Sequence, residues 1–432
     1  MYVKFLIVNH YDCRNKGDHS VLSSMLESLK RFFPAAEIIV LSHYPRTDSV
    51  RCNAIILESI VKPSPGTYAK LVTLIDMARC MIWALFMRYL GLGMNKLVPA
   101  QKAKTMSAYS KADAVLARST DWFNDVYVTK TFVTAFYEIL IAVLMGKKTV
   151  IYAQTIGPIK NDLKGKLCKF ALRSLFSRID LIMVREKNSK QFLRSIGLNR
   201  PSVYITADPA FNLQPSSRER TDEIFEQNDL PRNNSLPLIG INISRLTYRY
   251  CFPELRSLNE KYECYTRMMA ELIDHITDKL NALVVLVPHV FGPSAFDDRK
   301  ACNDVFRKVK NKQRTRMIQD EYSPEELRSV IGRFDFFIGM RMHAIIHALS
   351  MCVPTIGIDY LGKVRGIMAM ADQSRLVCRA DTLNLDELLE KVTLVIRNKD
   401  EIRNTLALKV KILQEKATLN TILVKKLLES AP

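Results

Sequence analysis

The stretch FDFFIGMRMHAIIHAL, residues 334–349, decides the fold. Residues 334–338 are typical of a strand buried on both faces, and residues 344–349 have helical character. The pattern therefore predicts a strand, a tight turn and a helix, the unit from which parallel α/β sheets are built. In an open α/β sheet, ligands bind outside the carboxyl ends of the strands. Arg341 and His343 thus offer a fixed cation and a titratable imidazole to an anionic substrate that must also be protonated.

The composition limits the class of protein. With 432 residues, of which 48% are hydrophobic, the chain is long enough for two folded domains. Its formal net charge of +19 favours polyanionic partners, namely nucleic acid, an anionic membrane face or phosphorylated substrates. The sequence has no zinc-finger spacing and no basic helix interleaved with aromatic residues, so nucleic acid is not an expected partner.

The cysteines and the N-terminus indicate the compartment. Nine cysteines are scattered without a Cys-x-x-Cys pair, as expected for free thiols in a reducing cytosol. Residues 1–8 are too short an apolar run for a signal peptide and are typical of a first strand. We therefore expect a cytoplasmic protein.

Strand and helix patterns alternate along the chain, which predicts βαβ units and mainly parallel sheets. Residues 214–237 are rich in Ser, Arg, Asn and Pro and are typical of a linker. The prediction is an α/β fold with two Rossmann-like domains, residues 1–213 and 238–384, facing a cleft. A helical segment is expected over residues 385–432.

An apolar, amphipathic insertion lies near residues 68–105. Asp76, Arg79 and Arg88 interrupt it, so its uncharged stretches are shorter than the ~20 apolar residues that a membrane span needs. Lysines such as Lys70 and Lys96 flank its apolar part, residues 71–94. A helix of this kind can lie in the headgroup region of a membrane, or it can be a core helix with its polar face outward. Both interpretations stay open.

Polar groups follow several of the predicted strands. The first set is Asn15-Lys16-Gly17-Asp18, where Gly17 allows a turn that a side chain would obstruct. Asp18 either caps the following helix or faces the cleft and handles an acceptor hydroxyl. After a later strand, Gln154 is a candidate hydrogen-bond partner for a sugar, although loop chemistry alone also explains the Gly-Pro turn that follows.

Three charged or titratable residues occupy similar positions. Arg185 is a bidentate partner for phosphate or carboxylate if it points into the cleft, and an ordinary surface ion pair otherwise. His289 follows a strand of the second domain. Lys363 follows Gly362 at a helix start, where backbone N–H groups and charge hold an anion, unless the segment is a solvated basic loop. Neither a P-loop nor a GxGxxG motif occurs.

The pair His343 and His347 raises the question of zinc, because the two residues are four apart. The metalloprotease pattern needs Glu after the first His, and here that residue is Ala344. No carboxylate or cysteine cluster supplies a third ligand nearby in the sequence, so no metal is predicted. His347 is predicted to be a hydrogen-bonded core histidine.

Taken in order, these motifs resemble those of the polysaccharide pyruvyl transferase family. The matching segments, which span most of the chain, are residues 15–18, 153–158, 184–189, 207–211, 240–242, 288–289, 339–344 and 362–364. The resemblance implies a fold of glycosyltransferase type B, with the acceptor on the first domain and the donor on the second. It also implies transfer of pyruvate from phosphoenolpyruvate to a sugar as a ketal. By that similarity, Arg185, Arg341 and His343 match donor-site positions.

One segment departs from the family pattern. Family members usually have a glycine-rich turn where this chain has residues 117–125, which carry larger side chains. This departure predicts either a different acceptor or a loss of activity.

The resemblance implies a route for the reaction. Phosphoenolpyruvate binds over the second domain, with Arg341 and Lys363 near its phosphate and Arg185 at its carboxylate. His343 protonates the methylene carbon, since an imidazole with an unperturbed pKa of about 6.5 suits acid catalysis. A sugar hydroxyl then attacks the adjacent carbon, with Asp18 as base or clamp, and no metal or further cofactor is required. The substrate-binding candidates are Asn15, Gly17, Gln154, Asn242, His289 and Lys363.

Two other functions stay open. An ordinary glycosyltransferase would use a sugar nucleotide in the same cleft, and a membrane-associated binding protein that has lost its chemistry would fit the altered segment 117–125. The expected partners are phosphoenolpyruvate and a sugar or lipid-linked oligosaccharide of a cell-surface polysaccharide. For a peripheral protein at the inner membrane face, an anionic membrane surface is a further partner.

Overall fold

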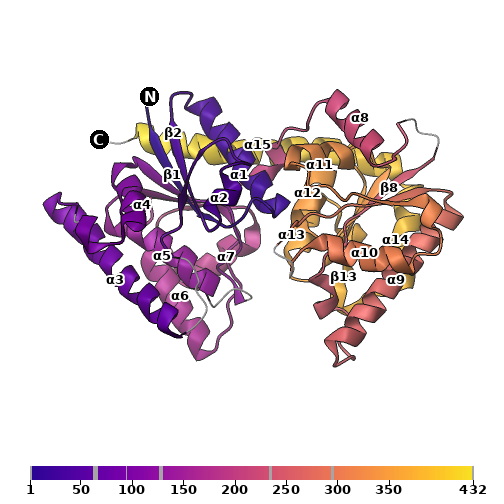
Figure 1. The fold of residues 1–432 in the computed structure, drawn as a ribbon, viewed down its shortest axis with the longest axis horizontal. Helices are drawn as coiled ribbons and strands as arrows, with labels where there is room; N and C mark the ends of the chain where they lie inside the picture. Colours follow the sequence, from indigo (N-terminus) through magenta and orange to yellow (C-terminus); the bar gives the residue numbers. More distant parts are fainter. Residues whose placement is uncertain are drawn as a thin grey trace. The chain divides into compact units, whose positions relative to one another are not determined.

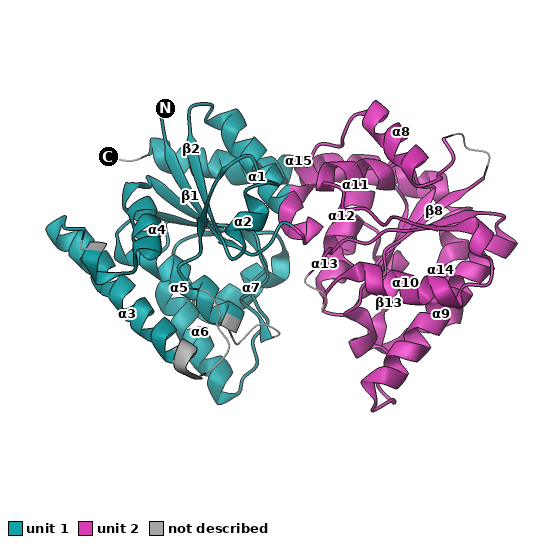
Figure 2. Ribbon diagram, viewed as in Figure 1, with its two compact units in different colours: residues 1–13, 21–209, 415–432 teal, residues 14–20, 210–414 magenta. Residues whose placement is uncertain are grey.

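The computed structural model of this chain describes residues 2–61, 67–93, 95–125, 130–232, 236–292 and 296–430. The chain divides into two compact units (Figure 2). Unit 1 comprises Met1–Cys13, Val21–Pro209 and Glu415–Pro432, and unit 2 comprises Arg14–Ser20 and Ala210–Gln414. The helices at the two chain ends are thus shared between units.

Unit 1 is built on a seven-stranded parallel sheet of order β3-β2-β1-β4-β5-β6-β7 (Figure 1). Its central strands are buried along their whole length, which explains their nearly continuous apolar sequences. The strands are β1 (Lys4–His10), β2 (Glu37–Ser42), β3 (Ile55–Glu58), β4 (Ala114–Ala117), β5 (Lys148–Gln154), β6 (Leu181–Val184) and β7 (Val203–Ile205).

Helices supply the two core clusters that cover this sheet. One cluster contains apolar residues of α3, α4, α5 and α6, and the other contains residues of α1 and α15. The helices are α1 (Lys16–Phe32), α2 (Pro45–Asp48), α3 (Thr67–Leu90), η1 (Asn95–Leu97), α4 (Ala100–Lys111), α5 (Lys130–Leu144), α6 (Leu163–Phe176) and α7 (Lys187–Ser195).

Unit 2 has a six-stranded parallel sheet of order β10-β9-β8-β11-β12-β13. The chain runs outward from β8 to β10, then returns to β11 on the other side of β8. The point between β8 and β11 is therefore the topological switch of this sheet. The strands are β8 (Leu238–Ile241), β9 (Leu283–Leu286), β10 (Thr315–Met317), β11 (Phe336–Gly339), β12 (Thr355–Asp359) and β13 (Val377–Arg379).

Helices alternate with these strands. The α-helices are α8 (Arg218–Gln227), α9 (Leu258–Lys279), α10 (Asp298–Lys308), α11 (Pro324–Ile331), α12 (Met342–Ser350), α13 (Lys363–Met370), α14 (Leu385–Arg397) and α15 (Lys399–Glu429). Short 3-10 helices are η3 (Pro209–Asn212), η4 (Thr247–Tyr250), η5 (Lys312–Arg314), η6 (Ser374–Leu376) and η7 (Ala380–Thr382).

The predicted α/β class with parallel Rossmann-like sheets is confirmed. Residues 334–349 form β11, the turn and α12, as predicted. Residues 214–237, predicted as a linker, contain α8, whose Ile224 and Phe225 are buried in the core of unit 2. This segment therefore belongs to unit 2. Its composition resembled that of a linker because its polar residues lie on one side of an amphipathic helix.

The insertion near residues 68–105 folds into α3, η1 and α4. Within the described part of the chain, no helix is long and apolar enough to cross a membrane. Along α3, Cys80, Trp83 and Ala84 are buried, while many large apolar side chains are exposed. The helix therefore packs on unit 1 through one narrow stripe only.

Candidate functional site

The predicted residues of unit 2 gather at the switch point of its sheet. Asn242 follows β8, and its side chain joins two neighbouring strand ends. Its Oδ1 accepts the backbone N–H of Arg341 at 2.9 Å, and its Nδ2 donates to the carbonyl of Val287 at 2.9 Å. Asn242 is fully buried, so its role in the described structure is to fix the turn after β11.

Arg341 is held by a buried carboxylate. Its Nε and Nη2 donate to the two oxygens of Asp298 at 3.1 and 2.7 Å, a bidentate arrangement. Burial raises the pKa of Asp298, and the guanidinium opposes that shift. The side chain of Arg341 is 14% exposed. Asp298 therefore sets the orientation of Arg341, a role that the sequence interpretation missed.

His343 lies against the first turn of α1. A Cβ atom added to Gly17 would lie 2.3 Å from Nδ1 and 2.8 Å from Cγ of His343. No L side chain fits at that separation, so the glycine is required by the imidazole. The Gly17 N–H also donates to Oδ1 of Asn15 at 3.1 Å, which holds the turn in place.

The segment Arg14–Ser20 is attached to the loop after β9. Asn15 and Val290 form an isolated antiparallel bridge, and the Lys16 N–H donates to the carbonyl of His289 at 3.0 Å. The buried Lys16 ammonium pairs with Glu321 at 2.7 Å. These bonds explain why the segment belongs to unit 2, although its neighbours in sequence belong to unit 1.

Asp18 and Lys363 place opposite charges in the same site. Oδ2 of Asp18 accepts from Nδ2 of Asn15 at 2.9 Å. Lys363 begins α13, directly after Gly362, which has a φ of +83°. Burial lowers the pKa of Lys363 to about 8, and the charge of Asp18 opposes this shift. The ammonium therefore titrates close to neutral pH.

His289 is a neutral imidazole buried beside these cations. It is 1% exposed, and neither ring nitrogen has a hydrogen-bond partner among the described residues. Burial lowers its pKa well below the usual value, and the positive charges of His343, Arg341 and Lys16 lower it further. An imidazole in this state stays neutral and can accept a hydrogen bond from a ligand.

His347 packs against His289, with ring centroids 5.1 Å apart. Nε2 of His347 lies 2.8 Å from Oγ of Ser20, and burial lowers the pKa of the imidazole well below its usual value. The prediction of a hydrogen-bonded core histidine is confirmed.

Eight of the ten predicted site residues therefore lie in unit 2, joined by the contacts given above: Asn15, Gly17, Asp18, Asn242, His289, Arg341, His343 and Lys363. The other two, Gln154 and Arg185, lie in unit 1. Gln154 is fully buried and donates from Nε2 to the carbonyl of Arg118 at 2.8 Å.

Arg185 is 2% exposed and joins three strand ends of unit 1. Its Nε donates to Oγ1 of Thr155 at 2.6 Å, and its Nη1 donates to Oδ2 of Asp208 at 2.5 Å and to Oγ of Ser119 at 3.4 Å. Arg185 therefore forms an ion pair, as the alternative interpretation predicted, but the pair is buried and does not lie at the surface. A ligand carboxylate at Arg185 would have to compete with Asp208.

Residues 117–125, the segment that departs from the family pattern, fill the interior of unit 1. Arg118 is fully buried and its Nε donates to the carbonyl of Asn9 at 3.4 Å. Phe123 packs edge-on against Phe132 and Phe176, with centroids 5.3 and 5.6 Å away. The larger side chains therefore have a packing role where a glycine-rich turn would leave space.

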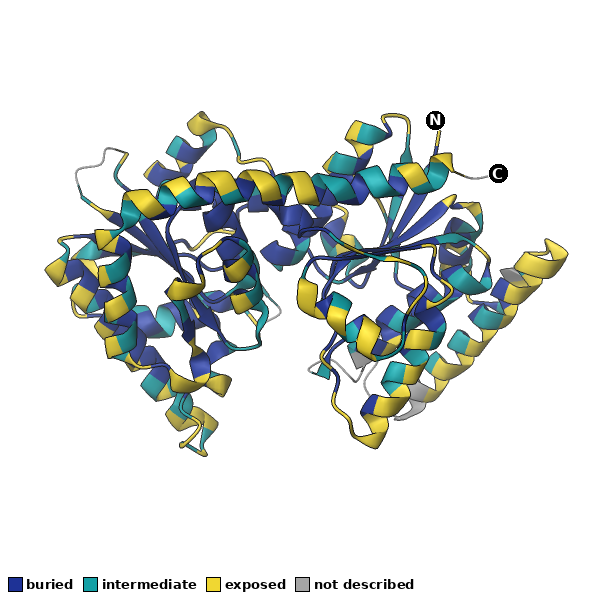
Figure 3. Ribbon diagram, turned by 180° about the vertical axis from the view of Figure 1, so that it is seen from behind, coloured by how far each residue is buried: buried dark blue, intermediate teal, exposed yellow. Residues whose placement is uncertain are grey.

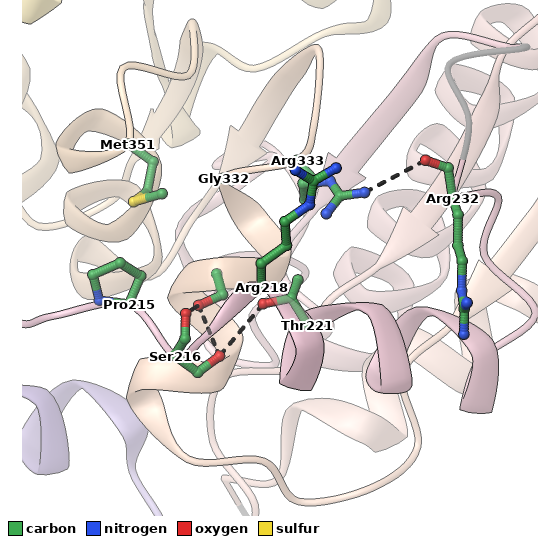
Figure 4. A pocket seen from close by; sticks show the side chains of 9 residues that line it. Pro215, Ser216, Arg218, Thr221, Arg232, Gly332, Arg333 and Met351 are labelled. Atoms are coloured by element: carbon green, nitrogen blue, oxygen red, sulfur yellow. Dashed lines mark hydrogen bonds between the residues drawn. The ribbon is translucent and has the colours of Figure 1, made fainter.

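A pocket of about 630 Å³ lies elsewhere in unit 2 (Figure 4). Its lining includes Arg218, Arg333 and Met351. Arg333 precedes β11, whereas Arg341 and His343 follow it, so this pocket opens at the opposite edge of the sheet. None of the predicted site residues lines it.

Comparison with known proteins gives a family and a fold. A family model described as polysaccharide pyruvyl transferase matches residues 15–362. The amylovoran biosynthesis protein AmsJ of Erwinia amylovora is 23% identical over 417 residues, which cover 94% of this chain and 95% of that protein.

Three solved structures with similar folds are distant from this chain in sequence. The UDP-GlcNAc 2-epimerase of Methanocaldococcus jannaschii has a TM-score of 0.61 at 11% identity, covering 98% of this chain and 100% of that chain. The UDP-GlcNAc 2-epimerase of Neisseria meningitidis, bound to UDP-GlcNAc, has a TM-score of 0.57 at 14% identity, covering 99% and 100%. The glycosyltransferase SnogD of Streptomyces nogalater has a TM-score of 0.53 at 12% identity, covering 99% and 100%. The fold is therefore the two-domain α/β fold of glycosyltransferase type B.

Proposed function

The chain belongs to the polysaccharide pyruvyl transferase family, and from this premise we propose that it moves the enolpyruvyl group of phosphoenolpyruvate onto a sugar. The acceptor is a cell-surface polysaccharide or its lipid-linked precursor, and the product is a pyruvate ketal. The observation that supports this proposal is the group of one carboxylate, two imidazoles and two cations around Gly17 in unit 2.

The cations suit the phosphate of the donor. Lys363 stands in the first turn of α13, where backbone N–H groups and the helix dipole also favour an anion. Arg341 follows β11 at the switch point, and Asp298 holds its guanidinium in one orientation. A dianionic phosphate near both would raise the fraction of charged Lys363, because an opposite charge favours the protonated form.

His343 supplies the proton in the proposed reaction. Protonation of the methylene carbon makes a methyl group and leaves the adjacent carbon electrophilic. One sugar hydroxyl attacks that carbon and releases its proton, which Asp18 accepts in this proposal. The carbon–oxygen bond to phosphate then breaks, inorganic phosphate leaves, and a second hydroxyl attacks to close the ketal. The proton of that second hydroxyl leaves with phosphate, and the proton on Asp18 returns through solvent to His343, so atoms and charges balance and both groups are restored.

His289 and Asn15 position the reacting groups in this scheme. The neutral His289 imidazole is proposed to accept a hydrogen bond from a substrate hydroxyl. Asn15 holds both the Gly17 amide and the Asp18 carboxylate, so it fixes the distance between base and acid. No step of this scheme draws on a metal or a further cofactor.

The two residues of unit 1 have weaker support. Arg185 was predicted to bind the donor carboxylate and Gln154 to bind a sugar. Both side chains are buried and bonded within unit 1, where Asp208 already pairs with Arg185. These two roles stay predictions, and variants of each residue test them.

The alternative donor is a sugar nucleotide. It is kept because the Neisseria epimerase of similar fold is bound to UDP-GlcNAc. A thermal-shift experiment separates the two donors, since a ligand that binds the folded state raises the melting temperature. We expect phosphoenolpyruvate, and not UDP sugars, to raise it.

Turnover provides the second test. Purified protein with phosphoenolpyruvate is expected to release phosphate only when a sugar acceptor is present. If UDP sugars raise the melting temperature and phosphoenolpyruvate does not, the result would favour the glycosyltransferase. No phosphate release with any acceptor, although phosphoenolpyruvate binds, would favour the binding protein that has lost its chemistry.

We further propose that unit 1 binds the surface of an anionic membrane. On α3, the exposed apolar residues recur at helical spacing, so they form one continuous face. Figure 3 shows the exposed side of this helix. The large apolar residues of α3 that are exposed are Leu71, Val72, Leu74, Ile75, Ile82, Leu85, Phe86, Tyr89 and Leu90.

A second apolar stripe lies on α6. Leu163, Leu167 and Phe170 are 77%, 63% and 73% exposed and lie at positions i, i+4 and i+7. Both helices contribute to the core cluster on the same side of the sheet. Exposed Lys164 and Lys166 flank the stripe. Apolar residues beside lysines suit an anionic bilayer, into which the apolar side chains insert while the ammonium groups meet lipid phosphates.

A further inference from the structure

Two cysteines, one histidine and one aspartate form a cluster in unit 1 that contains none of the residues proposed for the transfer reaction. His10 ends β1, and Cys13 follows in the next turn. Asp48 ends α2, and Cys52 follows four residues later. His10, Cys13 and Asp48 are fully buried, and Cys52 is half-buried. All four residues belong to the same compact unit.

The atoms of this cluster that can bind a metal face one another. Nε2 of His10 lies 3.1 Å from Oδ2 of Asp48 and 3.4 Å from Sγ of Cys13. Each of these three atoms lies within 4.8 Å of the other two. Sγ of Cys52 lies 2.9 Å from Sγ of Cys13. Cys13 thus belongs to two groups of possible ligands, one with His10 and Asp48 and one with Cys52 and His19, all of types that zinc prefers.

We propose that His10, Cys13 and Asp48, with Cys52 as the fourth ligand, form a structural zinc site. In a tetrahedral zinc site, Zn–S bonds of about 2.3 Å and Zn–N bonds of about 2.0 Å put neighbouring ligand atoms roughly 3.2 to 3.8 Å apart. The distances from His10 to Cys13 and Asp48 are close to this range.

The two sulfur atoms must separate by about 1 Å to reach tetrahedral spacing. Cys52 can make that movement, because it lies half-buried in a turn just beyond α2 and outside any regular element. Cys13 is more constrained, since its N–H donates to Oδ1 of Asp48 at 2.9 Å. Cys52 would therefore be the residue that moves, and its side chain would turn toward His10 and Asp48.

The sequence spacing and the outer contacts also suit a metal site. The ligands come as two short chelating pairs, His10-x-x-Cys13 and Asp48-x-x-x-Cys52, and short pairs of this kind are usual in zinc sites. Oδ2 of Asp48, the oxygen beside His10, also accepts the hydroxyl of Ser42, and Oδ1 accepts the N–H of Cys13, so the carboxylate is held in place. Such outer hydrogen bonds orient the ligands of metal sites.

The alternative is a hydrogen-bonded network without metal. In that case, His10 and Asp48 are joined by a hydrogen bond, and the two thiols lie 2.9 Å apart. A zinc ion would satisfy all four groups together, and it would fix the chain where β1 leads into the segment Arg14–Ser20. This site is independent of the proposed transfer reaction, which proceeds without it.

The metal content of the purified protein tests the proposal. Protein prepared under reducing conditions and without chelator is expected to contain about one zinc per chain by mass spectrometry. The variants Cys13→Ser and His10→Ala are expected to lose it, whereas Cys168→Ser, a half-buried cysteine on α6, keeps it. Cys52→Ser is expected to weaken retention during dialysis against a chelator.

The wild-type protein gives a readout that does not depend on folding of the variants. After chelation under reducing conditions, cobalt(II) is expected to restore the melting temperature and to give a sulfur-to-cobalt absorption band. The proposal is overturned if the reduced protein binds neither metal, or if Cys13 and Cys52 form a disulfide and no metal binds after its reduction. Zinc retained in both Cys13→Ser and His10→Ala would also overturn it.

Discussion

Gly17 and His343 are so close that the backbone of one residue determines the position of the other. A Cβ atom at residue 17 would lie 2.3 Å from Nδ1 of the imidazole. These residues are more than 300 positions apart in the sequence. The contact places the general acid of the proposed reaction directly beside the turn that carries Asp18.

The substitution Gly17→Ala tests this contact. Gly17 does not have a positive φ, so the backbone tolerates alanine and only the collision with His343 matters. Because displacement of a reacting group by about 1 Å can cost roughly 100-fold in rate, we expect kcat to fall by about that factor, with little change in melting temperature. Ser23→Ala, a half-buried position in the same helix, serves as the control and should behave as wild type.

Removal of the imidazole should have the largest effect on chemistry. A general acid contributes roughly 10²- to 10⁴-fold, so His343→Asn should reduce phosphate release in the presence of acceptor by at least 100-fold. Binding of phosphoenolpyruvate, measured by calorimetry, should persist. His275→Asn, at an exposed position on α9, is the matched control. Near-normal turnover by His343→Asn would remove His343 from the mechanism.

Asp298 should act through Arg341. Asp298→Asn keeps the size of the side chain but weakens the bidentate pair, so we expect kcat/KM for phosphoenolpyruvate to fall roughly 10- to 100-fold, the range of 1.4 to 2.8 kcal/mol for a charge-assisted pair. The neighbouring Asp297→Asn should have little effect, because Asp297 pairs with Arg299 instead. In the Arg341→Lys background, Asp298→Asn should cost much less. Equal losses in both backgrounds would contradict the positioning role.

The titration of Lys363 predicts a pH dependence of donor binding. Its pKa is lowered to about 8 by burial, so the ammonium loses its proton as the pH rises through about 8. Affinity for phosphoenolpyruvate should therefore be highest below this pH and decrease above it. In the Lys363→Arg variant, the decrease in affinity measured by calorimetry should move to higher pH, because arginine stays charged. If the affinity of this variant decreases at the same pH as that of wild type, another group causes the pH dependence.

The same group affects stability in the opposite direction. Between pH values of about 8 and about 10.4, the unfolded chain binds a proton at Lys363 that the folded chain has released. The contribution of Lys363 to the free energy of unfolding therefore rises with pH across this window. The free energies of unfolding of wild type and Lys363→Met, measured by denaturant titration, should converge toward the upper end of this pH window.

Membrane binding is predicted to depend on the two apolar stripes. In sedimentation with phosphatidylglycerol vesicles, the double variant Leu167→Glu and Phe170→Glu should bind at least about tenfold more weakly than wild type. Added salt should weaken binding further, since part of the attraction is electrostatic. Leu408→Glu, at an exposed position on α15, is the control. Binding to neutral and anionic vesicles alike, or dimerisation through α3 instead, would contradict an anionic membrane as the partner.

Several elements were predictable because their signals are local. The strand, turn and helix of residues 334–349 have periodicities that depend only on near neighbours, and β11 and α12 confirm them. The same reasoning placed His289 and Lys363 after strands. By contrast, β3 and β13 were not predicted, because β3 has no fully buried residue and both strands are short.

The partners of the site residues were not predictable in the same way. Asp298 was missed because an aspartate at a helix start is ordinarily a cap, and its bidentate contact with Arg341 spans more than 40 residues. Asp208, which pairs with Arg185, lies in a segment that was noticed only for its resemblance. Helix α8 was taken for linker because its exposed face dominates its composition.

By itself, the sequence determined the class of fold and the kinds of side chain at the strand ends, because burial repeats with the period of each element. Only the tertiary structure decided that Arg14–Ser20 leaves the unit of its neighbours and packs beside His289 and His343. The reason is that such contacts join residues hundreds of positions apart, and their geometry depends on how whole sheets fold rather than on any local pattern.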